Sequence, residues 1–224
     1  HNDVASFAEE IARARAQGAR RVFVAVESLY SMDGDFAPLG ELAALAREQD
    51  AMLVIDEAHA TGVYGVGGRG LGHALPGENV VMLHACGKAL GAYGALLCGP
   101  AALIDLLVNK ARPFIYSTAP PPLLAAAVTR ALGLLEEEPW RREALHANAA
   151  LLRGELGGHF APSQILPVIL GTEQAALAAA ASLRAQGFDV RAVRPPTGPE
   201  GGSRLRISVH AYHEKDEILK LYFD

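Results

Sequence analysis

Apolar runs of strand length alternate with segments of helical periodicity through much of the chain. The strand-like runs are almost wholly apolar, which is typical of parallel strands that are covered on both faces. Between them, apolar residues recur at helical spacing, and the first helix is expected to begin at Asn2 or Asp3 and to end at Gly18. The pattern predicts strands at 20–28, 51–59, 79–85 and 95–99, and helices at 2–17, 39–49, 100–112 and 121–157, the last broken near Glu138 and Pro139.

The pattern changes at about residue 160 and then follows the order strand, helix, strand, strand, helix. A Pro/Gly-rich loop at 195–202 separates the last two strands. We therefore predict an α/β fold with a mostly parallel sheet and helices on both faces, followed by a small α+β C-terminal lobe. The expected domains are 1–135 and 136–224. The lobe's expected elements are strands at 164–171, 188–193 and 203–210, a helix at 172–186 and a final short helix.

Composition limits the class of protein. Half of the 224 residues are hydrophobic and a fifth are charged, so the chain can bury a large core and is not expected to be disordered or fibrous. A net charge of -5 argues against a nucleic-acid surface. Cys86 and Cys98 are too few for a disulfide framework and suit a reducing cytoplasm. The N-terminus lacks the pattern of a secretory signal, and no apolar run reaches the length of a membrane span.

Polar residues cluster where the predicted strands end. Glu27 and Ser28 follow the first strand, Asp56 and His59 the second, and Lys88 the third. In open α/β sheets, ligands bind outside the carboxyl ends of the strands. We therefore predict a ligand site at this edge of the sheet.

Lys88 lies between Gly87 and Gly91, directly after a strand that is expected to be buried. Partial desolvation there would favour the neutral amine, which is the form that attacks carbonyl groups. The alternative is an ordinary lysine at the start of a helix. Because a helix N-terminus favours anions, a lysine at that position suggests a phosphate or an aldehyde nearby.

Asp56 and His59 suit the same kind of ligand. A carboxylate at the end of an apolar strand can keep a protonated pyridine nitrogen charged, and His59 is close enough in sequence to reach the same ligand. The alternatives are a helix N-cap for Asp56 and a locally satisfied histidine for His59. A metal site is also conceivable for the pair, but no further His or Cys stands at a supporting spacing.

Arg204 and Arg206 alternate with apolar residues in the last predicted strand and should share a face of it. An arginine in this setting is suited to a bidentate clamp on a carboxylate. The alternative for Arg206 is a solvated face of an edge strand.

Several segments resemble the α-oxoamine synthases, which are pyridoxal-phosphate enzymes of the aspartate-aminotransferase fold type. They occur in the family's order and across nearly the whole chain. The segments are ESLYSMDGDFAPL, DEAHATGVYGVGGRG, CGKALGAYGA, RPFIYSTAPPP and RPPTGPEGGSRLRISV.

The resemblance implies the roles of residues at the cofactor. Lys88 matches the lysine that forms the internal aldimine with pyridoxal 5'-phosphate, and Asp56 matches the aspartate bonded to the pyridine nitrogen. His59 matches the histidine near the phenolic oxygen. Ser31 and Glu27 match polar residues that line the pocket.

The resemblance also implies partners. Thr118 matches a residue that reaches the phosphate in the neighbouring subunit, so a homodimer with shared active sites is expected. Arg206 matches the arginine that holds the carboxylate of the amino acid. The element from Arg194 to Thr197 most resembles the biotin-pathway branch of the family, which condenses L-alanine with a pimeloyl thioester carried by coenzyme A or by a carrier protein. Glycine-using branches of the 2-amino-3-ketobutyrate ligase or 5-aminolevulinate synthase type are the alternatives.

The chain departs from the family pattern in two ways. The family usually has Thr or Ser three residues before the lysine, where it binds the phosphate, and here Ala85 stands there. His84 is a candidate replacement donor, although strand alternation directs it to the other face. Family members also have a long portion ahead of the point where this sequence begins, which supplies part of the cofactor pocket. If the polypeptide starts at His1, we expect poor stability and a non-catalytic chain.

Overall fold

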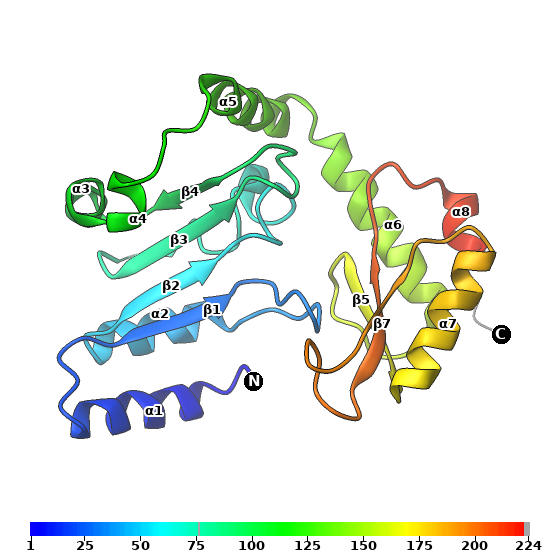
Figure 1. Ribbon diagram of the computed structural model, residues 1–224, viewed down its shortest axis with the longest axis horizontal. Helices are drawn as coiled ribbons and strands as arrows, with labels where there is room; N and C mark the ends of the chain where they lie inside the picture. The colour runs from blue at the N-terminus through cyan, green and yellow to red at the C-terminus, as the bar shows by residue number, and fades with distance from the viewer. Residues whose placement is uncertain (76, 222–224) are drawn as a thin grey trace. The chain divides into compact units, whose positions relative to one another are not determined.

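The structure, a computed structural model, describes residues 1–75 and 77–221 and divides into two compact units (Figure 1). The first unit comprises residues 1–29 and 36–139, and the second comprises 30–35 and 140–224. The division therefore falls after Pro139, somewhat later than the expected boundary after residue 135. The sequence pattern did not predict that residues 30–35 belong to the second unit.

The first unit is built on a sheet of four strands in the order β1-β2-β3-β4. The first three strands are parallel, and the fourth runs antiparallel to the third. This arrangement confirms the expected mostly parallel sheet, and each expected strand is present in shorter form. The strands are β1 (Phe23–Glu27), β2 (Met52–Asp56), β3 (Val80–Ala85) and β4 (Ala95–Cys98).

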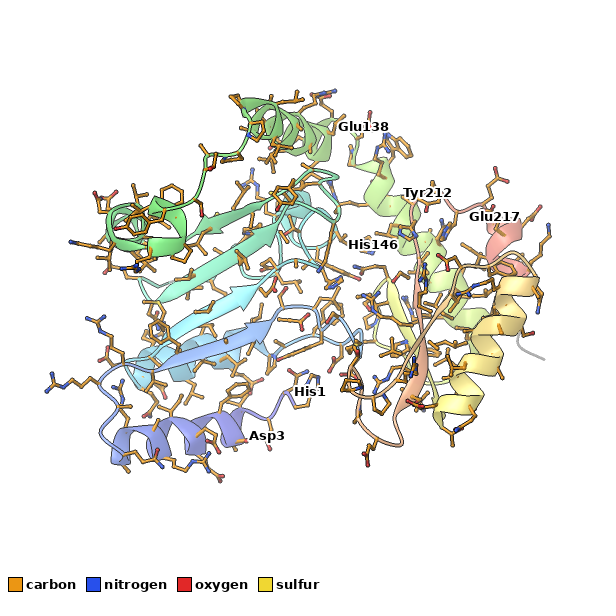
Figure 2. The ribbon with its side chains drawn as sticks, in the orientation of Figure 1. His1, Asp3, Glu138, His146, Tyr212 and Glu217 are labelled. Carbon is orange, nitrogen blue, oxygen red and sulfur yellow. The ribbon has the colours of Figure 1, made fainter. Side chains whose placement is uncertain are left out.

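The helices of the first unit lie close to the expected positions. Asp3 caps the first helix, because its side chain accepts a hydrogen bond from the backbone of Ser6 at 3.1 Å (Figure 2). The long helical pattern after residue 121 is broken at Glu138 and Pro139 as expected. The helices are α1 (Val4–Ala16), α2 (Leu39–Glu48), α3 (Ala101–Lys110), α4 (Arg112–Ile115) and α5 (Pro122–Glu137), with a short 3₁₀ turn, η1 (Val66–Gly68).

The core of the first unit lies between its sheet and α2. Leu53 and Ile55 on β2 are fully buried, as is Ala46 on α2, which packs against that strand. The coverage of the sheet is less even than its apolar composition suggests. Among the described residues, Phe23 on β1 remains 63% exposed and all of β4 is exposed.

The second unit is the expected small α+β lobe. Its sheet has the order β5-β7-β6 with antiparallel pairing, so β7 is central. The segment that carries Tyr212 returns beside α6, where the Asn148 side chain donates to the carbonyls of His210 and His213 (Figure 2). The elements are α6 (Trp140–Leu156), β5 (Ile165–Gly171), α7 (Glu173–Ala185), β6 (Arg191–Val193), β7 (Ser203–Ser208) and α8 (Lys215–Leu219). In the described part of the chain, no helix has the length and apolar character that crossing a bilayer requires.

Candidate active site

Asp56 is the last residue of β2 and stands at the carboxyl edge of the parallel strands. Its Oδ1 accepts a hydrogen bond from the Ala58 backbone N–H at 2.7 Å, which holds the carboxylate in one orientation. The residues that follow form a turn, so Asp56 does not cap a helix. Glu27, the last residue of β1, is its register partner, and the two carboxylates therefore leave neighbouring strands at the same level.

Lys88 lies in the turn that joins β3 to the antiparallel β4. Backbone hydrogen bonds close this turn: the Ala92 N–H donates to Cys86 O and the Gly91 N–H donates to Lys88 O, both at 2.9 Å. The alternative of an ordinary lysine at the start of a helix is therefore wrong. The Lys88 side chain is also exposed, so the expected partial desolvation is not found in this chain.

The structure brings Lys88 and His59 together. The Lys88 Nζ lies 2.8 Å from the His59 Nε2, although the residues are far apart in sequence. A protonated Nζ can only donate, so in that state the Nε2 of His59 is the acceptor. An amine and an imidazole in hydrogen-bond contact can exchange a proton, which is the basic requirement for acid–base chemistry.

Glu57 is a buried carboxylate that the sequence pattern did not indicate. Its side chain accepts hydrogen bonds from the Ser28 hydroxyl at 2.7 Å and from the backbone N–H groups of Leu71 and Gly72, at 3.1 and 2.5 Å. The residue is fully buried. Glu57 thereby ties the end of β1 to the glycine-rich loop and fixes the turn between Asp56 and His59.

Gly70 shows how closely the loop approaches this carboxylate. Its φ is +90°, and a Cβ built at this position would lie 2.7 Å from the Glu57 carboxyl carbon. Both conditions require glycine. The glycines at 65, 67, 68, 70 and 72 are therefore the sequence signal that indicates a close approach of this loop to a buried side chain such as Glu57.

Thr61 and His84 extend the network to β3. The Thr61 hydroxyl donates to Glu57 O at 2.8 Å and lies 2.8 Å from His84 Nδ1. Because the hydroxyl has a single hydrogen, its oxygen accepts from a protonated Nδ1. Burial lowers the pKa of His84, although the nearby Glu57 and Asp56 oppose that shift. The neutral Nδ1–H imidazole therefore fits this site.

The stability of the fold should depend on the protonation of His84. Its pKa is lowered from 6.5 in the folded chain, so the unfolded chain takes up this proton first as the pH falls. The stabilising contribution is present above about pH 6.5 and is lost as the pH falls toward the lower, folded pKa. We expect His84→Asn, whose amide can still donate to Thr61, to reduce this acid-side loss.

The measurement is the free energy of unfolding in urea at intervals between about pH 8 and pH 5. The exposed His159 supplies the control, and His159→Asn should follow the original chain throughout. Identical pH profiles for His84→Asn and the original chain would contradict the prediction.

The remaining candidate residues are distributed over both units. Thr118 lies in the first unit, in an exposed segment after α4. Ser31 and Arg206 lie in the second unit, where the Arg206 Nε donates to the Ser31 carbonyl at 2.5 Å. Arg206 is half-buried on the central strand β7, so the alternative of a solvated edge strand is wrong.

Comparison with known proteins decides the family. The model for aminotransferase class I and II matches residues 1–222. This chain belongs to that family. It is 48% identical to the 8-amino-7-oxononanoate synthase of Anaeromyxobacter dehalogenans (strain 2CP-C), and the match covers 97% of this chain and 56% of the relative.

Solved structures agree with this family assignment. The chain has a TM-score of 0.89 and 30% identity to a serine palmitoyltransferase of Sphingomonas wittichii, a match that covers 97% of this chain and 56% of that one. A serine palmitoyltransferase from S. paucimobilis, with a bound pyridoxal phosphate–myriocin aldimine, gives a TM-score of 0.87 at 30% identity, with the same coverages of 97% and 56%. The resemblance to the α-oxoamine synthases is thus confirmed. The chain spans about half the length of the curated relatives it matches.

Proposed function

We propose that this chain belongs to a cytoplasmic, homodimeric C-acyltransferase that uses pyridoxal phosphate. The enzyme would condense L-alanine with a pimeloyl thioester, with loss of carbon dioxide, to give 8-amino-7-oxononanoate. The contact between Lys88 and His59 carries the proposal, because it supplies an amine and a proton acceptor. Asp56, the last residue of β2, stands at the same edge of the sheet. The similarity to synthases of that name supports the choice of substrates.

The residues at this edge of the sheet fit the cofactor. Lys88 offers the amine that reacts with an aldehyde, and His59 lies beside that amine. Asp56 offers a carboxylate that its bond to the Ala58 N–H holds in place. When bound, pyridoxal phosphate supplies the aldehyde and a protonated ring that accepts the electron pair of a carbanion.

The chain's own residues would then bind the substrates and transfer the protons. Asp56 holds the proton on the pyridine nitrogen, because the carboxylate stabilises the charged form. Lys88 Nζ removes the proton from the α-carbon of L-alanine and later returns a proton, with His59 Nε2 as its hydrogen-bond partner. Arg206 holds the carboxylate of the amino acid and so selects the bond that breaks. Thr118 would serve the phosphate in the partner subunit, while Ser31 and Glu27 would line the pocket.

An assay over a panel of amino acids tests the substrate assignment. With a pimeloyl thioester and pyridoxal phosphate, we expect product and carbon dioxide from L-alanine and little from glycine. Mass spectrometry of the product measures this directly. Turnover with glycine but not with L-alanine would contradict the proposal and favour the 2-amino-3-ketobutyrate ligase or 5-aminolevulinate synthase type.

Ala85 supports a second candidate, a chain that does not hold the cofactor well enough for catalysis. A hydroxyl-to-phosphate hydrogen bond expected from the family is missing here, and His84 already engages Thr61 through its Nδ1. Ala85→Thr should restore one bond to a charged acceptor and lower the Kd for pyridoxal phosphate by about 10- to 100-fold.

A spectroscopic titration of the chain with pyridoxal phosphate measures this effect. Ala85→Val is the matched control, because valine has the shape of threonine without the hydroxyl. Equal gains in affinity for the threonine and valine variants would show that packing, rather than a hydrogen bond, is responsible and would overturn the prediction.

A further inference from the structure

Two arginines of β7 hold the segment 30–35 within the second unit. The Arg206 Nε donates to the carbonyl of Ser31, and the Arg204 Nη1 donates to the carbonyl of Met32 at 3.3 Å. The same Nη1 lies 2.5 Å from the Asp33 carboxylate. The arginines therefore bind successive residues of the segment, and opposite charges meet across the contact.

Arg204 is the buried member of this contact. Its side chain is only 7% exposed, whereas that of Asp33 is 47% exposed. The Arg204 Nε also donates to Gly202 O at 2.9 Å. A buried guanidinium is tolerated only when it is paired and hydrogen-bonded, so the ion pair with Asp33 gives this segment a defined place on β7.

Gly34 attaches the segment at a second point. It is buried with a φ of +67°, and a Cβ at this position would lie 2.2 Å from the carbonyl oxygen of Ile165 on β5. The turn is closed internally, because the Gly34 N–H donates to Tyr30 O and the Tyr30 N–H donates to Asp35 O, both at 2.9 Å. The segment is therefore a structured part of the second unit.

The segment in turn fixes the plane of the Arg206 guanidinium. That group donates from Nε to Ser31 O at 2.5 Å and from Nη1 to the Ser208 hydroxyl at 3.0 Å. Because a guanidinium is planar, contacts at two of its nitrogens fix its orientation. The Ser31 carbonyl, one of these acceptors, belongs to the segment that Arg204 holds.

We propose that Arg204 is a positioning residue for Arg206. Its ion pair with Asp33 holds the segment on β7, and the Ser31 carbonyl of that segment then orients the Arg206 guanidinium toward the carboxylate of an amino-acid substrate. This inference rests on the proposed function in one respect only, namely that the ligand of Arg206 is the carboxylate of an amino-acid substrate. The positioning itself depends on contacts within the second unit.

Hydrogen exchange at the Arg206 Nε–H, followed by NMR on the chain without added ligand, tests the positioning. In Asp33→Asn we expect this proton to exchange at least about tenfold faster, because its acceptor is no longer held in place. The control is Asp189→Asn, which removes an exposed ion pair with Arg191, the register partner of Arg206 on β6. That variant should leave the Arg206 exchange unchanged.

Backbone amide protection at Leu205 on β7 shows whether each variant is folded. If Asp33→Asn unfolds, Arg204→Lys replaces it, because lysine keeps the charge but cannot reproduce the planar set of contacts to Asp33, Met32 and Gly202. Faster exchange at Arg206 in a folded variant supports the proposal. Unchanged exchange in a folded variant overturns it.

Ligand affinity separates this proposal from the proposed function. On the chain loaded with pyridoxal phosphate, Asp33→Asn should weaken L-alanine binding by about tenfold and leave that of ethylamine, which has no carboxylate, unchanged. If Arg206 exchange rises but L-alanine affinity does not fall, Arg206 is not the carboxylate site, and the proposed substrate role fails while the positioning stands.

Discussion

Replacing Lys88 with alanine is expected to abolish covalent attachment of pyridoxal phosphate to the chain. The amine that reacts with the aldehyde is lost. The neighbouring His59 imidazole remains, but it cannot form the covalent bond that the lysine amine forms with the aldehyde. The removal of the proton-transfer group alone should also lower any condensation rate by ~10²–10⁴-fold. Visible absorbance after addition of the cofactor, followed by borohydride reduction, measures the attachment.

Lys110 at the end of α3 supplies the matched control for this experiment. It is exposed, like Lys88, but lies outside the candidate site. We expect Lys110→Ala to bind the cofactor as the original chain does. Retention of the absorbance band in Lys88→Ala, or its loss in Lys110→Ala, would contradict the assignment of Lys88.

Of the substitutions considered, replacing Glu57 with alanine is expected to cause the largest loss in the free energy of unfolding. The change leaves the buried Ser28 hydroxyl, the buried N–H of Gly72 and the partly buried N–H of Leu71 without their acceptor. Unsatisfied buried donors cost about 1–3 kcal/mol each, and together we expect a loss of about 3–5 kcal/mol in the free energy of unfolding.

Urea unfolding monitored by circular dichroism measures the effect of Glu57→Ala. Glu57→Gln should be intermediate, because the amide keeps an acceptor oxygen but turns an NH₂ group toward one of the donors. Glu48, exposed on α2, gives the control, and Glu48→Ala should change stability by less than about 0.5 kcal/mol. A Glu57→Ala variant as stable as the Glu48 control would show that the network contributes little.

The sequence predicted the elements well wherever a local pattern determines them. The alternation of apolar strands and amphipathic helices located β1 to β3, and Pro139 marked the break between α5 and α6. Strand ends also located Asp56, His59 and Lys88 correctly at one edge of the sheet. These features depend on periodicity and on residue types that can be read within a short window.

Features that depend on distant partners could not be predicted in this way. The role of Glu57 requires Ser28 and a loop many residues later, and the pair Arg204–Asp33 joins positions 171 residues apart. The sequence left a helix start open as an alternative for Lys88, because a few residues carry too little periodicity to distinguish a turn from a helix start. The exposure of the Lys88 side chain depends on how neighbouring segments pack, which strand patterns do not specify.

We propose that Lys88 is the residue that binds pyridoxal phosphate. The most direct measurement is borohydride reduction of the original chain mixed with the cofactor, followed by peptide mapping with mass spectrometry. We expect a single reduced adduct, located on Lys88. An adduct distributed over the exposed lysines, such as Lys110 and Lys215, with none enriched at Lys88, would contradict it.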